Sequence, residues 1–104
     1  MDLPPLHPWG LSQPDAVALQ KRLAASVETD TPLGDYELVA GADVSYDRFS
    51  PVLHAAVVLL RRGDWEVVEV AGAVGESAFP YVPGLLSFRE APVLLQAFAT
   101  LRRR

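Results

Sequence analysis

Two acidic residues stand where the surrounding sequence does not require a charge. Asp43 interrupts the apolar run 40–46, and Glu90 closes the segment 87–90, just ahead of Pro92. A carboxylate in apolar surroundings is costly to bury as an ion unless it is paired or bound to a metal. Mg²⁺ is commonly held by one or two protein carboxylates together with waters and phosphate oxygens. One hypothesis is therefore that Asp43 and Glu90 are oxygen ligands of a divalent cation.

Each carboxylate also has a plainer interpretation. Strand alternation places Asp43 on the opposite side from Ala42 and Val44, so it can lie on the solvent face of a half-exposed strand. Glu90 can lie at the start of a helix and complement the helix dipole, which is worth roughly 0.3–1 kcal/mol. The two residue types by themselves do not separate these options.

The segment 80–83 combines two prolines with an aromatic and a β-branched residue. Pro80 and Pro83 fix the backbone on either side of Tyr81 and Val82. A rigid apolar tip of this kind can be inserted into a base stack, as intercalating proteins do. The alternative is a stiff connector whose Tyr81 folds back onto the core.

The elements that must position these residues begin with a helix over 12–28. Ser12 is a suitable N-cap, Pro14 suits the first turn, and Asp15 complements the helix dipole. Three runs rich in apolar and β-branched residues then predict strands at 38–46, 53–60 and 65–74. The short links 62–64 and 47–51 favour antiparallel pairing throughout. The prediction is a three-stranded meander in which His54 is a simple strand-face residue.

The last part of the chain is expected to be helical. Residues 85–90 can make a helical turn, and Pro92 then begins a new helix with its apolar face at positions 93, 94, 97, 98 and 101. Three antiparallel strands with these helices leave one sheet edge open and one face thinly covered. We therefore expect an incomplete α/β unit.

Length and composition bound the class of protein. The 104 residues suffice for one domain, which we divide into an extended lead-in at 1–11 and a folded portion at 12–104. There is no cysteine, and the net charge of −4 argues mildly against a general nucleic-acid coat protein without excluding a nuclease. The first residues do not resemble a signal peptide, and the longest apolar stretch, 55–60, is too short to span a bilayer. The expected location is cytoplasmic, with no membrane partner.

Two segments carry a resemblance to a known family. The run AGADVSY at 40–46 and the run PYVPGLLSFRE at 80–90 closely resemble endonuclease V, and the hairpin between them matches in order and spacing. The second run is long and specific. The likeness extends from the first helix to the last residue, and it implies the N-terminal portion of an RNase H-like α/β fold.

The resemblance implies a DNA repair endonuclease that cleaves a phosphodiester 3′ to a deaminated base such as deoxyinosine, although some members prefer inosine in RNA. Asp43 and Glu90 would be the catalytic carboxylates and would bind Mg²⁺, with Mn²⁺ as the alternative metal. Arg89 could meet a phosphate oxygen, although a salt bridge on the helix surface is the plainer expectation. A wedge that separates the strands would be formed by Pro80, Tyr81, Val82 and Pro83. A pocket for the flipped base would be formed by Gly84, Leu85 and Leu86.

The resemblance also implies parts that this sequence lacks. The family has a further strand ending in Asp-Gly-His-Gly, which supplies a third carboxylate, and a later histidine near the metal. Without them, we expect the 104-residue chain to be inactive alone. The alternative hypothesis is a non-catalytic remnant that binds nucleic acid or assembles with another chain through its open sheet edge.

Overall fold

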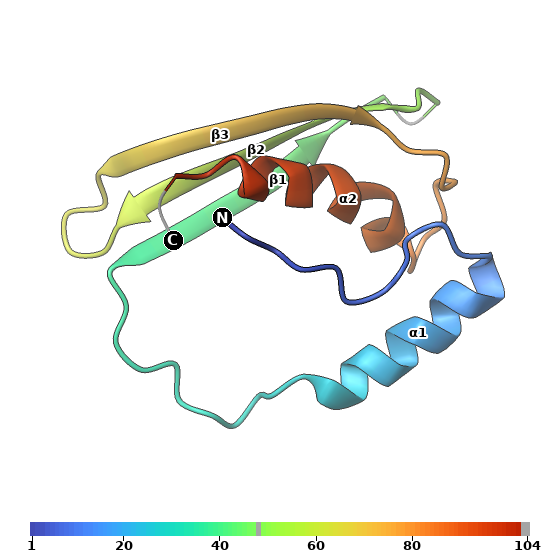
Figure 1. Cartoon of the computed structure of the whole chain (residues 1–104), viewed down its shortest axis with the longest axis horizontal. Coiled ribbons are helices and arrows are strands. Elements are labelled where there is room, and N and C mark those ends of the chain that lie inside the picture. The colour runs from blue at the N-terminus through green and yellow to red at the C-terminus, as the bar shows by residue number, and fades with distance from the viewer. Residues whose placement is uncertain (48, 103–104) are drawn as a thin grey trace.

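The computed structural model describes residues 1–47 and 49–102. Its elements follow the order α1 (Gln13–Ser26), β1 (Leu38–Ser45), β2 (Val52–Arg61), β3 (Val67–Glu76) and α2 (Leu86–Ala99). The strands form one antiparallel sheet in the order β1-β2-β3, α2 lies against one face of it, and α1 lies apart from the sheet (Figure 1). The predicted helix, meander and final helix are therefore confirmed.

Helix α1 begins as its sequence predicts. The Ser12 Oγ accepts a hydrogen bond from the Asp15 backbone N–H at 3.3 Å, and Pro14 lies in the first turn, where its missing N–H leaves no bond unmade. The helix ends at Ser26, two residues before the expected end, because Val27 already has an extended backbone. Only Ala16 and Leu19 are buried, so α1 rests on the rest of the protein through a short stretch.

The sheet alternates cleanly on its central strand. Four β2 residues point toward α2 and are buried: Leu53, Ala55, Val57 and Leu59. The third strand begins at Val67 rather than at 65, because the link from β2 is longer than a tight hairpin turn and a register shift follows Leu59. Trp65 has a φ of 58°, and Gly63 has a φ of 111°, so both belong to the turn and not to a strand.

Helix α2 is continuous from Leu86 to Ala99 and contains Pro92, so the expected break before Pro92 is wrong. Proline in a helix removes one hydrogen bond and crowds the carbonyl four residues earlier, which here belongs to Phe88. Packing on both sides of Pro92 offsets this cost. Phe88 is buried in one apolar cluster, and Val93 is buried in another.

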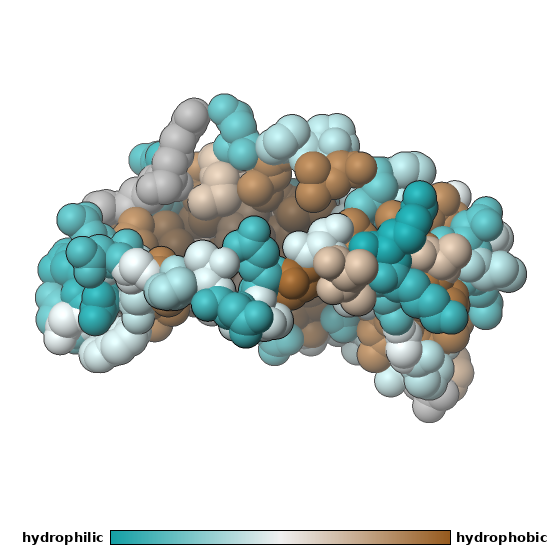
Figure 2. Space-filling view, turned by 90° about the horizontal axis from the view of Figure 1, so that it is seen from below, coloured by the Kyte–Doolittle hydropathy of each residue, from teal (hydrophilic) through white to brown (hydrophobic). Residues whose placement is uncertain are grey.

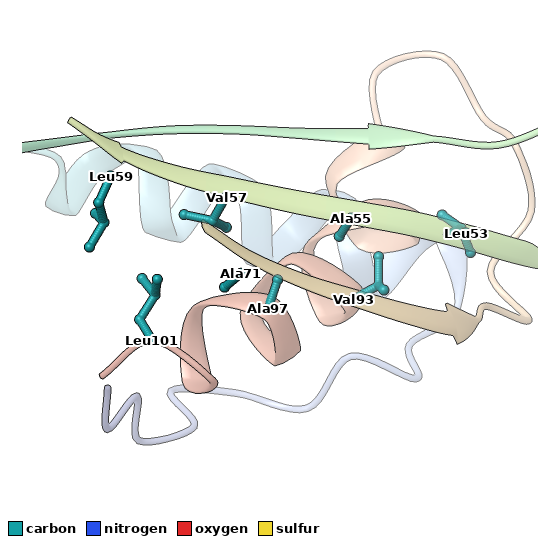
Figure 3. Packing of buried hydrophobic residues seen from close by; sticks show 8 residues of the cluster. All are labelled: Leu53, Ala55, Val57, Leu59, Ala71, Val93, Ala97 and Leu101. Atoms are coloured by element: carbon teal, nitrogen blue, oxygen red, sulfur yellow. The ribbon is translucent and has the colours of Figure 1, made fainter. Parts of the chain in front are cut away.

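Two clusters of buried residues hold the chain together. The main cluster lies between the sheet and α2 and includes Val57, Val93 and Ala97 (Figure 3). The second consists of Ala16, Leu19, Leu85 and Phe88, and it attaches α1 to the start of α2.

The surfaces next to these clusters are less evenly covered. Seen from the side of α1, hydrophobic residues gather in a hollow between hydrophilic rims (Figure 2). The sheet face that points away from α2 has little cover: Val70 and Val74 are 63% and 64% exposed.

The lead-in, expected to be simply extended, is tied to the end of α2. The Met1 ammonium donates to the Leu101 carbonyl at 2.7 Å and lies 3.3 Å from the Ala99 carbonyl. This cation lies where a helix dipole is negative, and the last turn of α2 has no basic residue of its own.

Within the described residues, no helix is long and apolar enough to cross a membrane.

Candidate active site

Asp43 lies on β1, which is an edge strand within the described part of the sheet. Its register partner is Ala56, and its neighbour Val44 packs against the main cluster. Asp43 therefore points to the sheet face away from α2, as strand alternation predicts. The side chain is exposed, and its Oδ1 accepts a hydrogen bond from the Val44 backbone N–H at 2.9 Å. The burial cost that made Asp43 conspicuous in the sequence does not apply.

A shallow hollow lies beside Asp43 on this open face. It is lined by Ser45, His54 and Ala56 among others. Ser45 pairs directly with His54, and Ser45 and Asp43 share a face because they are two positions apart on one strand. A hydroxyl and an imidazole thus accompany the carboxylate. The sequence predicts only a simple strand-face position for His54, and the strand register reveals its neighbours.

Glu90 is half-buried on α2. The helix begins at Leu86, so Glu90 is past the first turn, and the interpretation as a helix-start carboxylate is wrong. Positions 90, 93 and 97 share one helix face, and Val93 and Ala97 are buried against the sheet. Glu90 therefore lies on the sheet-facing side of α2, near the helix start.

The two carboxylates belong to different layers of the structure. Asp43 lies on the open sheet face, whereas Glu90 is on the helix that covers the opposite face. In the described portion, no group of three or more acidic, histidine or cysteine side chains could hold a metal. The chain thus offers two carboxylates, one of them freely accessible, but not a complete ligand shell.

The segment 80–83 is folded partly back on the protein. Tyr81 lies against Tyr46 and is 38% exposed. Val82 is half-buried against the second cluster, and its carbonyl accepts the Leu85 N–H at 2.9 Å. Gly84 follows with a φ of 86°, a conformation that favours glycine. The loop is therefore a fixed turn whose tyrosine ring is partly exposed to solvent. The exposed part of the ring is compatible with insertion into a base stack, whereas its contact with Tyr46 is compatible with a connector that folds back onto the core.

The residues expected to line a base pocket are divided between core and surface. Leu85 is buried in the second cluster, Leu86 is half-buried and Gly84 is exposed. A groove runs between this turn and α1. Its walls are Gln13, Pro14, Val17 and Gln20 on the helix side, and 82–85 on the loop side.

Arg89 differs most from its expected position. It is 5% exposed, so the predicted salt bridge on the helix surface is wrong. Its Nη1 donates to the Phe79 carbonyl at 2.9 Å, its Nη2 donates to the Ser50 carbonyl, and the guanidinium lies over the Tyr46 ring at 4.8 Å. The spacing along the helix indicates this burial, because Arg89 is four residues before Val93 and therefore falls on the same buried stripe of the helix.

An antiparallel meander with a helix across one face, an acidic residue on the first strand and another on that helix are features of an RNase H-like nuclease fold. The endonuclease V family model matches residues 18–104. The chain belongs to the endonuclease V family.

Individual relatives agree with this assignment. Endonuclease V of Dehalococcoides mccartyi is 47% identical over 96 residues, a match that covers 92% of this chain and 43% of the relative. The crystal structure of endonuclease V from Streptomyces avermitilis is similar with a TM-score of 0.82 and 43% identity, over 91% of this chain and 42% of that one. The Ciona intestinalis enzyme, at 22% identity and a TM-score of 0.73, shares the fold over 86% of this chain and 39% of its own. The chain thus spans less than half the length of these relatives.

Proposed function

We propose that this chain contributes to a metal-dependent DNA repair endonuclease that cleaves the phosphodiester 3′ to a deaminated base such as deoxyinosine. The observation that carries the proposal is the family match over 18–104, which includes both carboxylates and the loop 80–83. The endonuclease V of Ciona intestinalis was crystallised with a DNA that contains an inosine followed by a ribo-adenosine. DNA is therefore the proposed substrate, with inosine-containing RNA as the alternative.

Asp43 and Glu90 are the proposed catalytic carboxylates and metal ligands. Two carboxylates suit Mg²⁺, which keeps several waters and is completed by substrate phosphate, and Mn²⁺ would be accepted by the same oxygens. The bound ion would activate water and stabilise the leaving oxygen of an in-line displacement. Asp43 is exposed beside a hollow, so an ion and a phosphate can approach it from solvent.

The loop 80–83 is the proposed wedge. Enzymes that act on a base inside a duplex must extrude the nucleotide, which costs a few kcal/mol and less for a mispaired base. Tyr81 presents a partly open ring on a backbone stiffened by Pro80 and Pro83. The exposed surface of Gly84 and Leu86 would contribute to the pocket for the extruded base, with Leu85 supporting it from the core.

Metal binding gives a direct test on the chain as it stands. Addition of Mn²⁺ should enhance water proton relaxation in the wild-type protein, and Asp43→Asn should abolish the enhancement, with a smaller loss in Glu90→Gln. Asp64→Asn is the matched control, because Asp64 is an exposed carboxylate that pairs with Arg61 and accepts the Glu66 N–H within a turn, away from Asp43 and Glu90. Equal losses in all three variants would indicate unspecific charge attraction and would contradict the metal site.

Cleavage is the second test. We expect negligible nicking of a deoxyinosine duplex in Mg²⁺ by this chain alone, because two carboxylates without a third leave the metal poorly supported. Turnover comparable to that of the Dehalococcoides mccartyi enzyme, lost in Asp43→Ala, would refute this expectation.

A second candidate is a non-catalytic chain that acts through assembly or nucleic-acid binding. The exposure of Val70 and Val74 on the bare sheet face favours it, because contiguous apolar surface promotes association. Sedimentation analysis at increasing concentration tests the assembly version. A strictly monomeric, cooperatively folded chain would count against it.

A further inference from the structure

Among the described residues, Arg89 is the charged residue whose side chain is buried, and it forms no ion pair with a carboxylate there. Burying a charge without an opposite charge is unfavourable, and an apolar side chain of similar volume would fill the same space at lower cost. What Arg89 offers instead is a planar fork of three nitrogens, of which Nη1 and Nη2 donate to carbonyls and Nε has no acceptor among the described residues. The value of this residue must therefore lie in what the fork holds.

The fork joins two loops to a helix. Nη1 donates to the carbonyl of Phe79 and Nη2 to the carbonyl of Ser50, and each of these residues directly precedes a proline. Pro51 and Pro80 have no N–H, so neither loop can be tied down by an amide at that position. One backbone bond, from the Ser77 N–H to the Pro51 carbonyl at 2.9 Å, also links the two loops. Arg89 adds two bonds from the helix.

The same guanidinium contacts the Tyr46 ring, which in turn contacts the Tyr81 ring. It lies 4.8 Å from the ring centroid of Tyr46, and the Tyr46 ring in turn meets the Tyr81 ring at 6.3 Å. A cation over an aromatic face is attracted more strongly when the pair is shielded from water, and here Arg89 is buried and Tyr46 is half-buried. The loop that carries Tyr81 is thus held at its start through Phe79 and at its ring through Tyr46.

We propose that Arg89 is a positioning residue that fixes the loop 77–83, and with it Tyr81, relative to the end of β1 and the start of α2. These two elements carry Asp43 and Glu90. The hydrogen bonds of Arg89 do not require a substrate. The role that we assign to them rests on the proposed function, in which they set the position of the wedge relative to the two carboxylates. Arg89 itself does not contact the nucleic acid.

Fluorine NMR of the intact chain labelled with 3-fluorotyrosine tests the proposal without DNA. The chain has three tyrosines, so phenylalanine substitution of each in turn assigns the three resonances. Arg89→Lys keeps the charge but not the fork, and Arg89→Met removes both. We expect the Tyr81 resonance to move toward its position in the denatured chain in both variants, with Tyr46 moving as well.

Arg62 provides a matched control, because its guanidinium lies over the Tyr36 ring at 4.5 Å on the surface. Arg62→Met should shift Tyr36 and leave Tyr81 unchanged. A Tyr81 resonance that stays at its wild-type position in folded Arg89→Lys would overturn the proposal, whatever the loss of thermal stability. If neither Arg89 variant folds, Tyr46→Leu decides: it removes the ring between Arg89 and Tyr81, and an unmoved Tyr81 resonance would refute the coupling.

Binding separates this proposal from the proposed function. Arg89→Lys should reduce the preference for a deoxyinosine duplex over an undamaged one by about tenfold, the change expected when a charge-assisted hydrogen bond is lost. If the wild-type chain shows no preference for deoxyinosine, the proposed function fails for this chain. The fluorine spectra still decide the role of Arg89 in that case, because they require no DNA.

Discussion

The rings of Tyr46 and Tyr81 meet edge to face, with centroids 6.3 Å apart and planes at 61°. Tyr46 follows the end of β1, so this contact joins the Asp43 strand to the loop 80–83. An aromatic pair of this kind is worth about 0.5–1.5 kcal/mol beyond its buried area. The contact is therefore strong enough to orient Tyr81 and weak enough to be exchanged for stacking on a base.

Truncation of Tyr81 should affect binding through the ring rather than the hydroxyl. Stacking of one base on an aromatic side chain is worth roughly 1–3 kcal/mol, so Tyr81→Ala should weaken binding of a deoxyinosine duplex by about tenfold or more. Tyr81→Phe should bind nearly as well as the wild type. Fluorescence anisotropy with a labelled duplex measures both, with Tyr36→Ala as control. Equal losses in the alanine and phenylalanine variants would contradict a stacking role.

Removal of the Asp43 charge should leave the fold intact. The carboxylate is exposed, and its described hydrogen bond is to the neighbouring Val44 N–H, which an asparagine oxygen can also accept. Asp43→Asn should change the free energy of unfolding by no more than about 0.5 kcal/mol. Urea denaturation followed by circular dichroism provides the measurement. A larger loss of stability would mean that Asp43 has a structural role, and its assignment as a ligand would weaken.

The turn after the wedge depends on Gly84. Its φ of 86° is unfavourable for residues with a Cβ, although the space around the position is open. Gly84→Ala should therefore destabilise the chain by about 1 kcal/mol through backbone strain alone. Gly10→Ala, also in open space but without a positive φ, should be nearly neutral. Similar thermal midpoints for the two variants would show that the turn does not need its left-handed residue.

Acetylation of the Met1 amino group should destabilise the attachment of the lead-in. It removes the ammonium that donates to the Leu101 carbonyl and the positive charge at the end of α2. The expected loss is about 0.3–1 kcal/mol, and it should shrink at high salt as charges are screened. Thermal melts of acetylated and free protein at low and high salt measure it. A loss that does not depend on salt would point to packing of Met1 rather than its charge.

Local signals in the sequence were sufficient for most elements. Ser12 and Pro14 define the start of α1 because capping is decided by neighbours along the chain. Alternation correctly placed Asp43 on the open face for the same reason. The start of β3 was wrong by two residues, because the positive φ of Trp65 is imposed by the turn and is not encoded by residue type.

The misplaced parts of the site depend on contacts between distant segments. Pro92 predicts a helix start, but burial of Phe88 and Val93 on either side keeps α2 continuous. Arg89 predicts a surface charge, but carbonyls contributed by residues 50 and 79 make a buried position tolerable. The position of His54 beside Ser45 requires the strand register. The carbonyls that bind Arg89, and the residues that bury Phe88 and Val93, come from distant parts of the sequence, so local patterns could not identify them.

The order of elements along the chain has a consequence for synthesis. All three strands leave the ribosome before α2, whose Val93, Ala97 and following Leu101 supply the helical side of the main cluster. A small sheet without cover on at least one face is only marginally stable in water. During translation both faces of the sheet therefore stay exposed to water until residues 86–101 have emerged. Over that interval a chaperone has the best opportunity to bind, and a pause in translation before α2 would prolong it.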